Sequence, residues 1–142
     1  MRILGIDYGE KRIGIAISDP LQTVALGIGV IERSGKLKGD IKKIRDIIEK
    51  YGGVDEIVIG LPKTLKGKIG MEAEIVLKFI EDIKKVINVP LVTWDERLST
   101  VAAERPLREA HISRLKRKKV IDESAAVFML QGYLDRKRQK SL

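Results

Sequence analysis

The chain has 142 residues, the length of one domain, and its 44% apolar and 34% charged residues predict a folded core rather than a disordered chain. The net charge of +8 favours a polyanionic partner, and every apolar run is shorter than the roughly 18 residues that span a bilayer, so we expect one cytoplasmic domain over 1–142 without membrane contact. Cysteine is absent and His111 is the only histidine, which excludes disulfides and Cys/His zinc sites and leaves oxygen ligands for any metal.

Two isoleucine-rich runs at residues 2–7 and 12–18 predict an antiparallel hairpin that turns at Tyr8-Gly9-Glu10-Lys11. A third run at 24–31 extends it to a three-stranded meander. The first run is apolar on both faces, which is typical of a central strand, and it ends in Asp7. An ionised carboxylate at such a place needs a partner or a metal, although Asp7 can alternatively serve only to open the turn.

Helical and strand patterns alternate from residue 40 onwards. Isoleucines at helical spacing predict a helix over 41–51, which Gly52-Gly53 would end. A short strand at 57–59, a polar loop, a helix with its apolar face over 76–87 and a last strand at 91–94 follow, and we expect the remainder to be helical. The order predicts an α/β fold: a five-stranded mixed sheet, made of the meander and two parallel strands, with helices on its faces.

The last strand also ends in acids, Asp95 and Glu96. Neighbouring parallel strands place their carboxyl ends side by side, in the crevice where open α/β sheets bind ligands, so Asp7 and Glu96 are expected to meet there. Alternatively, one of the two acids after the strand is structural and bonds the backbone or Arg97.

Asp122 heads the third candidate segment, ahead of the small pair Ala125-Ala126, which would let this helix approach the sheet closely. An acid at a helix start can also be a simple cap. Three converging carboxylates without histidine or cysteine would form a hard, oxygen-lined site suited to Mg²⁺ or Mn²⁺.

Most of the positive charge is concentrated in residues 104–119, which carry seven basic and two acidic side chains. Such a segment can bind nucleic acid through phosphate contacts, or it can be an ordinary solvated surface. Three further cations lie near the acids in sequence and are candidates for holding phosphates, although Arg12 and Arg97 can instead form structural bridges to Asp19 or Asp95. The nucleic-acid-binding candidates are Lys11, Arg12, Arg97, Arg114, Lys116, Arg117, Lys118 and Lys119.

Four motifs in this order resemble the YqgF (RuvX) family of ribonuclease H-like proteins over nearly the whole chain. They are Gly5-Ile6-Asp7-Tyr8-Gly9 with Lys11-Arg12-Ile13-Gly14, then Gly60-Leu61-Pro62, Asp95-Glu96-Arg97-Leu98-Ser99-Thr100, and Asp122-Glu123-Ser124-Ala125-Ala126. The resemblance implies a ribonuclease H-like fold and a metal-dependent nuclease site at Asp7, Glu96 and Asp122. The loop Lys63-Thr64-Leu65-Lys66-Gly67 departs from the family, which often has Asn and a second polar or acidic residue there, so any role of a side-chain amide is in doubt.

Members of that family are described as Holliday-junction resolvases and as nucleases that mature the 5′ end of pre-16S rRNA. We therefore expect a nuclease acting on precursor rRNA, with branched DNA as the alternative substrate. A non-cleaving module for structured nucleic acid is a further alternative. A phosphotransferase related to actin-like ATPases would need a second such domain, for which 142 residues leave no room. The sequence leaves open whether the protein is a monomer or a homodimer.

Overall fold

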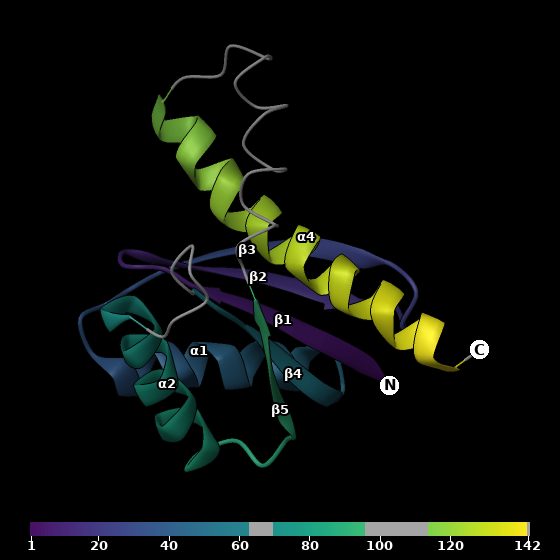
Figure 1. The fold of residues 1–142 in the computed structure, drawn as a ribbon. Helices are drawn as coiled ribbons and strands as arrows, with labels where there is room; N and C mark the ends of the chain where they lie inside the picture. The colour runs from purple at the N-terminus through teal and green to yellow at the C-terminus, as the bar shows by residue number, and fades with distance from the viewer. Residues whose placement is uncertain (63–69, 96–113, 142) are drawn as a thin grey trace.

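A computed structural model describes residues 1–62, 70–95 and 114–141 of the chain, with the backbone alone at 114–124 and 140–141. Its five strands form one sheet in the order β3-β2-β1-β4-β5 (Figure 1). The strands are β1 (Arg2–Tyr8), β2 (Arg12–Ser18), β3 (Ala25–Glu32), β4 (Val54–Leu61) and β5 (Leu91–Asp95). The helices are α1 (Leu37–Lys50), α2 (Met71–Lys84) and α4 (Arg114–Ser141).

β1 is the central strand, as its two apolar faces predict. It pairs with β2 in antiparallel and with β4 in parallel orientation, while β3 and β5 complete the two sides of the sheet. Ile3, Leu4 and Ile6 are fully buried because helices cover both faces of the sheet. The expected mixed sheet, with an antiparallel meander and two parallel strands, is confirmed.

The β1–β2 turn is closed by a hydrogen bond from the backbone N–H of Gly9 to the carbonyl oxygen of Arg12, at 2.9 Å. A Cβ atom on residue 9 would lie 2.7 Å from that same oxygen, which no side chain tolerates. The turn therefore requires glycine, and this requirement fixes the hairpin directly after Asp7.

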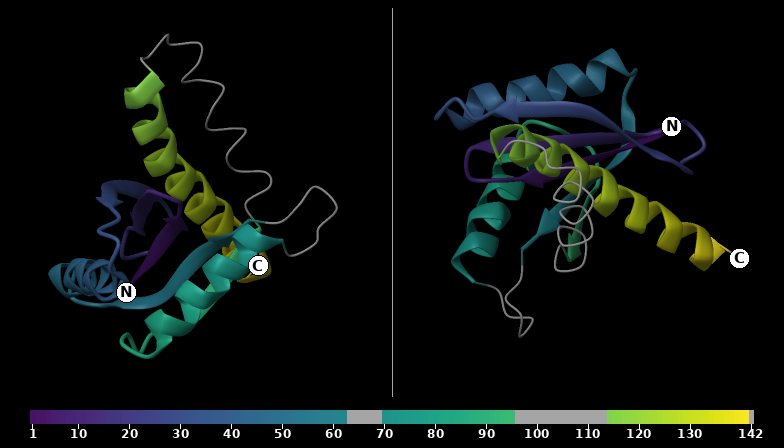
Figure 2. Two further views of the ribbon diagram at one scale, coloured as in Figure 1. Left: turned by 90° about the vertical axis from the view of Figure 1, so that its left-hand side faces the viewer. Right: turned by 90° about the horizontal axis from the view of Figure 1, so that it is seen from above.

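α1 and α2 cover one face of the sheet, as Figures 1 and 2 show. The isoleucines of α1 at helical spacing, with Val76, Phe79 and Ile83 of α2, pack on Leu4, Ile6 and the other side chains of that face. α1 ends as predicted before Gly52 and Gly53, whose φ angles of 77° and 101° favour glycine. It begins at Leu37, however, four residues before the first isoleucine, so the sequence pattern marked its buried face rather than its start. Within the described ranges, no helix is both long and apolar enough to cross a membrane.

α4 crosses the opposite face (Figure 2) and forms a second, smaller core. Ala126, Met129 and Leu130 are buried against this face, and the Cβ atom that residue 5 lacks would lie 3.0 Å from Cβ of Leu130. The close approach of the helix that the Ala125-Ala126 pair predicted is thus confirmed. In the sheet, the absence of a side chain at Gly5 leaves room for this approach. Together the two cores position the carboxyl end of β1 between two helical layers.

Candidate functional site

Asp7 lies at the carboxyl end of the central strand, on the face that α4 covers. Strand alternation places Ile3, Gly5 and Asp7 on this face and Leu4, Ile6 and Tyr8 on the other. Asp7 is half-buried, yet within the described part of the chain its carboxylate forms neither a hydrogen bond nor an ion pair. Since a carboxylate removed from water normally acquires a partner, Asp7 is available for a ligand that the described residues do not supply.

Glycines flank Asp7 within the sheet. Asp7 pairs with Gly14 of β2, and one step beyond the Ile6–Ile59 pair the same register places Gly60 of β4 on its other side. Neither neighbour has a side chain that could reach the carboxylate. Of these three neighbouring residues in the sheet, Asp7 is therefore the one that has a side chain.

The expected meeting of Asp7 and Glu96 assumed that β5, the strand before Glu96, is the direct neighbour of β1. In the structure it is not. β4 lies between β1 and β5, so their chains are two strand spacings, or about 10 Å, apart. Because Leu91 contributes to the α1–α2 face and Trp94 to the α4 face, alternation assigns Asp95 to the face opposite Asp7. Glu96, the other acid of the pair, lies outside the described residues.

Position 122 belongs to α4, where the backbone but not the side chain is described. It is one helical turn before Ala126, in the row that continues through Met129 or Leu130 to Tyr133. Ala126, Met129 and Leu130 of this row are buried against the sheet. The helix thus places position 122 on the same side as Asp7, inside α4 rather than at its start, so the interpretation of Asp122 as a cap is wrong.

The eight predicted phosphate-binding cations fall into four groups. Lys11 is exposed in the β1–β2 turn. Arg12 Nε lies 3.0 Å from Oε1 of Glu32 in an ion pair across β2 and β3, so Arg12 has a structural partner, but not one that the sequence suggested. Arg97 lies outside the described residues. The remaining five, at the start of α4 with only their backbone described, are Arg114, Lys116, Arg117, Lys118 and Lys119.

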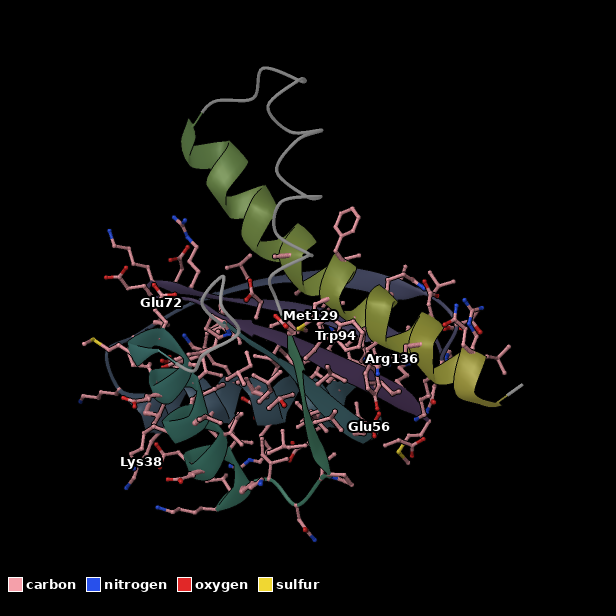
Figure 3. The ribbon with its side chains drawn as sticks, viewed as in Figure 1. Lys38, Glu56, Glu72, Trp94, Met129 and Arg136 are labelled. Atoms are coloured by element: carbon pink, nitrogen blue, oxygen red, sulfur yellow. The ribbon has the colours of Figure 1, made fainter. Side chains whose placement is uncertain are left out.

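A cleft of about 490 Å³ extends from Asp7 across the edge of the sheet to the start of α2, where Glu72 lies (Figure 3). The ring of Tyr8 stacks on Phe79 with centroids 3.9 Å apart, and the guanidinium of Arg33 lies 4.5 Å from its centre. Burial raises the pKa of Tyr8, an effect that Arg33 partly offsets. Tyr8 is therefore a structural residue and its ring is not free to stack on a base.

Arg33 is the residue of this cleft that sequence analysis missed. It follows β3, about two dozen positions after Asp7, and no motif or spacing marks it. Only the return of β3 alongside β2 brings it to the β1–β2 turn, where its Nη1 donates to the carbonyl oxygens of Gly9 and Glu10.

Trp94 packs between β5 and α4, as Figure 3 shows, and its ring meets that of Tyr133 edge-on at a centroid distance of 6.1 Å. The guanidinium of Arg136 lies 6.0 Å from the Trp94 ring centre. Trp94 is therefore a partly buried residue of the smaller core.

The donor atoms of Asp7 fit a hard divalent cation, because they are carboxylate oxygens to which no other described residue is bound. Among the residues whose side chains are described, no group of three or more acids or histidines could hold a metal by itself. The other two predicted ligands, Glu96 and Asp122, are not among the residues whose side chains are described.

A sheet of order β3-β2-β1-β4-β5 flanked by helices, with a carboxylate near the end of its central strand, defines the ribonuclease H-like class. Solved structures share this fold: RuvC of T. thermophilus in complex with a Holliday junction substrate superposes with a TM-score of 0.59 at 13% identity, covering 97% of this chain and 96% of that one. The Fowlpox virus resolvase bound to Holliday junction DNA superposes with a TM-score of 0.58 at 14% identity, with coverage of 96% and 99%.

The chain belongs to the RuvX family, whose sequence profile, described as Holliday junction resolvase, matches residues 1–136. A relative from Clostridium acetobutylicum is 55% identical over 135 residues, or 95% of this chain and 98% of the relative. Another from Clostridium kluyveri is 53% identical over 136 residues, or 96% and 98%. Both are provisionally named pre-16S rRNA nucleases.

Proposed function

We propose that this protein is a metal-dependent nuclease that hydrolyses phosphodiester bonds, with the 5′-end processing of pre-16S rRNA in the cytoplasm as its reaction. The observation that carries this proposal is the half-buried carboxylate of Asp7 at the carboxyl end of the central strand, which has no partner in the described parts of the chain. The provisional names of relatives more than 50% identical supply the substrate class.

Asp7 would hold Mg²⁺ or Mn²⁺, with Glu96 and Asp122 completing the oxygen ligands. When bound, such an ion supplies activation of a water molecule and neutralisation of the charge on the phosphate and the leaving oxygen. The chain supplies the rigid position of Asp7: the buried residues of β1 fix its backbone, and the glycines beside it keep the approach open. No protein nucleophile is required.

Nucleic acid would be held by cations on two elements. Lys11 is exposed on the turn after Asp7, and residues 114–119 begin the helix that carries position 122. The turn directly follows the strand that carries Asp7, and α4 covers the face of the sheet on which Asp7 lies. Phosphates bound there would direct the substrate backbone toward Asp7.

The replacement Asp7→Asn tests the nuclease site. We expect it to abolish Mg²⁺-dependent cleavage of a precursor rRNA fragment while the melting temperature and most of the RNA affinity are retained. Asp46→Asn, which removes an exposed carboxylate from α1, is the matched control and should cleave like the wild type. Undiminished cleavage by Asp7→Asn would refute the assignment.

Cleavage of four-way DNA junctions is the second candidate, favoured by the description of the family profile and by the shared fold of junction resolvases. A junction has two symmetric strands to cut and so requires a dimer, whereas trimming one RNA end requires one site. Comparison of both substrates at equal salt and Mg²⁺, together with sedimentation of the protein, distinguishes them. Preferential cleavage of the junction by a dimer would replace the rRNA assignment.

A further inference from the structure

We infer that Arg33 is a substrate-binding residue, whose guanidinium binds a backbone phosphate of the nucleic acid that crosses the sheet edge beside Asp7. The inference rests on the proposed nuclease function, which supplies the polyanion, but it concerns a cation that the motifs of the sequence did not include. It also places part of the substrate on the opposite side of the β1–β2 turn from α4.

The guanidinium of Arg33 is held in place from two directions. Nη1 donates to the carbonyl oxygen of Glu10 at 2.7 Å and to that of Gly9 at 3.1 Å, which uses both of its N–H groups. The ring of Tyr8 lies beneath the guanidinium at 4.5 Å, and because Phe79 stacks on that ring, the arginine occupies its other face. Arg33 is thus ordered before any ligand arrives, which lowers the entropic cost of binding.

The remaining donors of Arg33 have no acceptor among the residues that the structure describes. Nε and Nη2 together carry three N–H groups, and in the described portion of the chain none of them forms a hydrogen bond and no carboxylate forms an ion pair with this side chain. Arg12, by contrast, is paired with Glu32. A fixed guanidinium with one free edge has the geometry that binds two oxygens of a phosphate.

The charges that line the cleft indicate what Arg33 contributes to binding. Asp7, Glu10 and Glu72 line the cleft, and Arg33 is the one cation among the lining residues that the structure describes. Carboxylates repel a nucleic-acid backbone. A metal ion at Asp7 would offset one of them, and Arg33 is placed to attract the phosphate next to the one being cut.

RNA binding by an inactive protein isolates this contact from catalysis. In the Asp7→Asn background, a fluorescent 12-nucleotide single-stranded RNA is titrated across a salt series, with and without Arg33→Gln. Arg45→Gln, which removes an exposed arginine from α1, is the matched loss of one positive charge. We expect Arg33→Gln to weaken binding several-fold and to reduce the slope of log K against log salt by about 0.7 to 0.9, and Arg45→Gln to leave the slope unchanged.

A direct signal accompanies the titration. The Nε–H resonance of Arg33, assigned by its loss in Arg33→Gln, should shift on addition of the RNA. Equal slopes for the two arginine variants, an unmoved resonance, or no RNA binding at all would each overturn the inference. A lowered melting temperature with an unchanged slope would make Arg33 purely structural and also overturn it. If wild-type protein fails to cleave with Mg²⁺ while the slope difference persists, the nuclease proposal fails and the phosphate contact stands.

Discussion

A single distance explains why residue 9 must be glycine. Any Cβ atom at this position would lie 2.7 Å from the carbonyl oxygen of Arg12 and would force the β1–β2 turn apart. We predict that Gly9→Ala lowers the free energy of unfolding by about 1–3 kcal/mol, measured by urea denaturation. Because Asp7 and the Arg33 acceptors adjoin this turn, cleavage should fall as well.

Gly39 of α1 provides the control for this substitution, because its Cβ would meet nothing closer than the Ser34 hydroxyl at 3.6 Å. Gly39→Ala should be neutral or stabilise by up to about 1 kcal/mol, since alanine favours the helix. A Gly9→Ala protein as stable as Gly39→Ala would contradict the proposed crowding.

Tyr133 gives a prediction that depends on pH. Its hydroxyl donates a hydrogen bond to Glu56, and burial, followed by this carboxylate, raises the pKa of Tyr133 above its usual value of 10.0. The folded chain therefore retains the proton longer than the unfolded chain. The resulting stability is fully present below pH 10 and declines above it, as the unfolded tyrosine ionises.

Tyr133→Phe removes this contribution, and Glu56 retains Lys137 as a partner at 3.5 Å. We expect a loss of about 1–2 kcal/mol at pH 7 and a smaller difference from the wild type at pH 11. Denaturant titrations at both pH values provide the measurement. A difference that grows with pH would have the wrong sign for a raised pKa.

At the scale of elements, the contact between α4 and β1 affects both the stability of the fold and the geometry of the candidate site. Gly5→Val would insert a branched side chain where even Cβ lies 3.0 Å from Leu130, so we expect a loss of about 1–3 kcal/mol and reduced cleavage as α4 is displaced. Leu130→Ala alone leaves a cavity and should cost about 2–5 kcal/mol. If the two residues compete for the same space, the double variant will be more stable than the sum of the single losses predicts.

The first turns of α4 carry the second prediction at this scale. Replacing Lys116, Arg117, Lys118 and Lys119 with serine should weaken RNA binding and flatten its salt dependence without changing the Mg²⁺ requirement. Serine replacements of Lys42, Lys43, Arg45 and Lys50 remove the same charge from α1 and serve as the control. Equal salt slopes for the two proteins would show that residues 116–119 do not contact phosphates.

For the whole molecule, the sequence predicted the main elements and the kind of sheet they form, but not the strand order at the candidate site or the residues that this order brings to the cleft. The apolar run at 2–7 fixed β1 as the central strand, and Ala125-Ala126 correctly indicated a helix close to the sheet. The order β1-β4-β5 could not be derived from the acids at the strand ends, because it depends on which side of the sheet each crossover takes. Arg33 was missed for the same reason: only the pairing of β3 with β2 brings it to the cleft.

The arrangement of α4 also limits how this chain can vary. One row of positions on a single helix both seals the smaller core, through Ala126 and Met129, and sets the place of Asp122. Inserting one residue between 122 and 126 would rotate the acid about the helix axis by about 100° and leave Ala126 and Met129 packed against the sheet. With the proposed role of Asp122 as a metal ligand, insertions or deletions there would be tolerated by folding but not by cleavage, and the spacing itself would be a functional element.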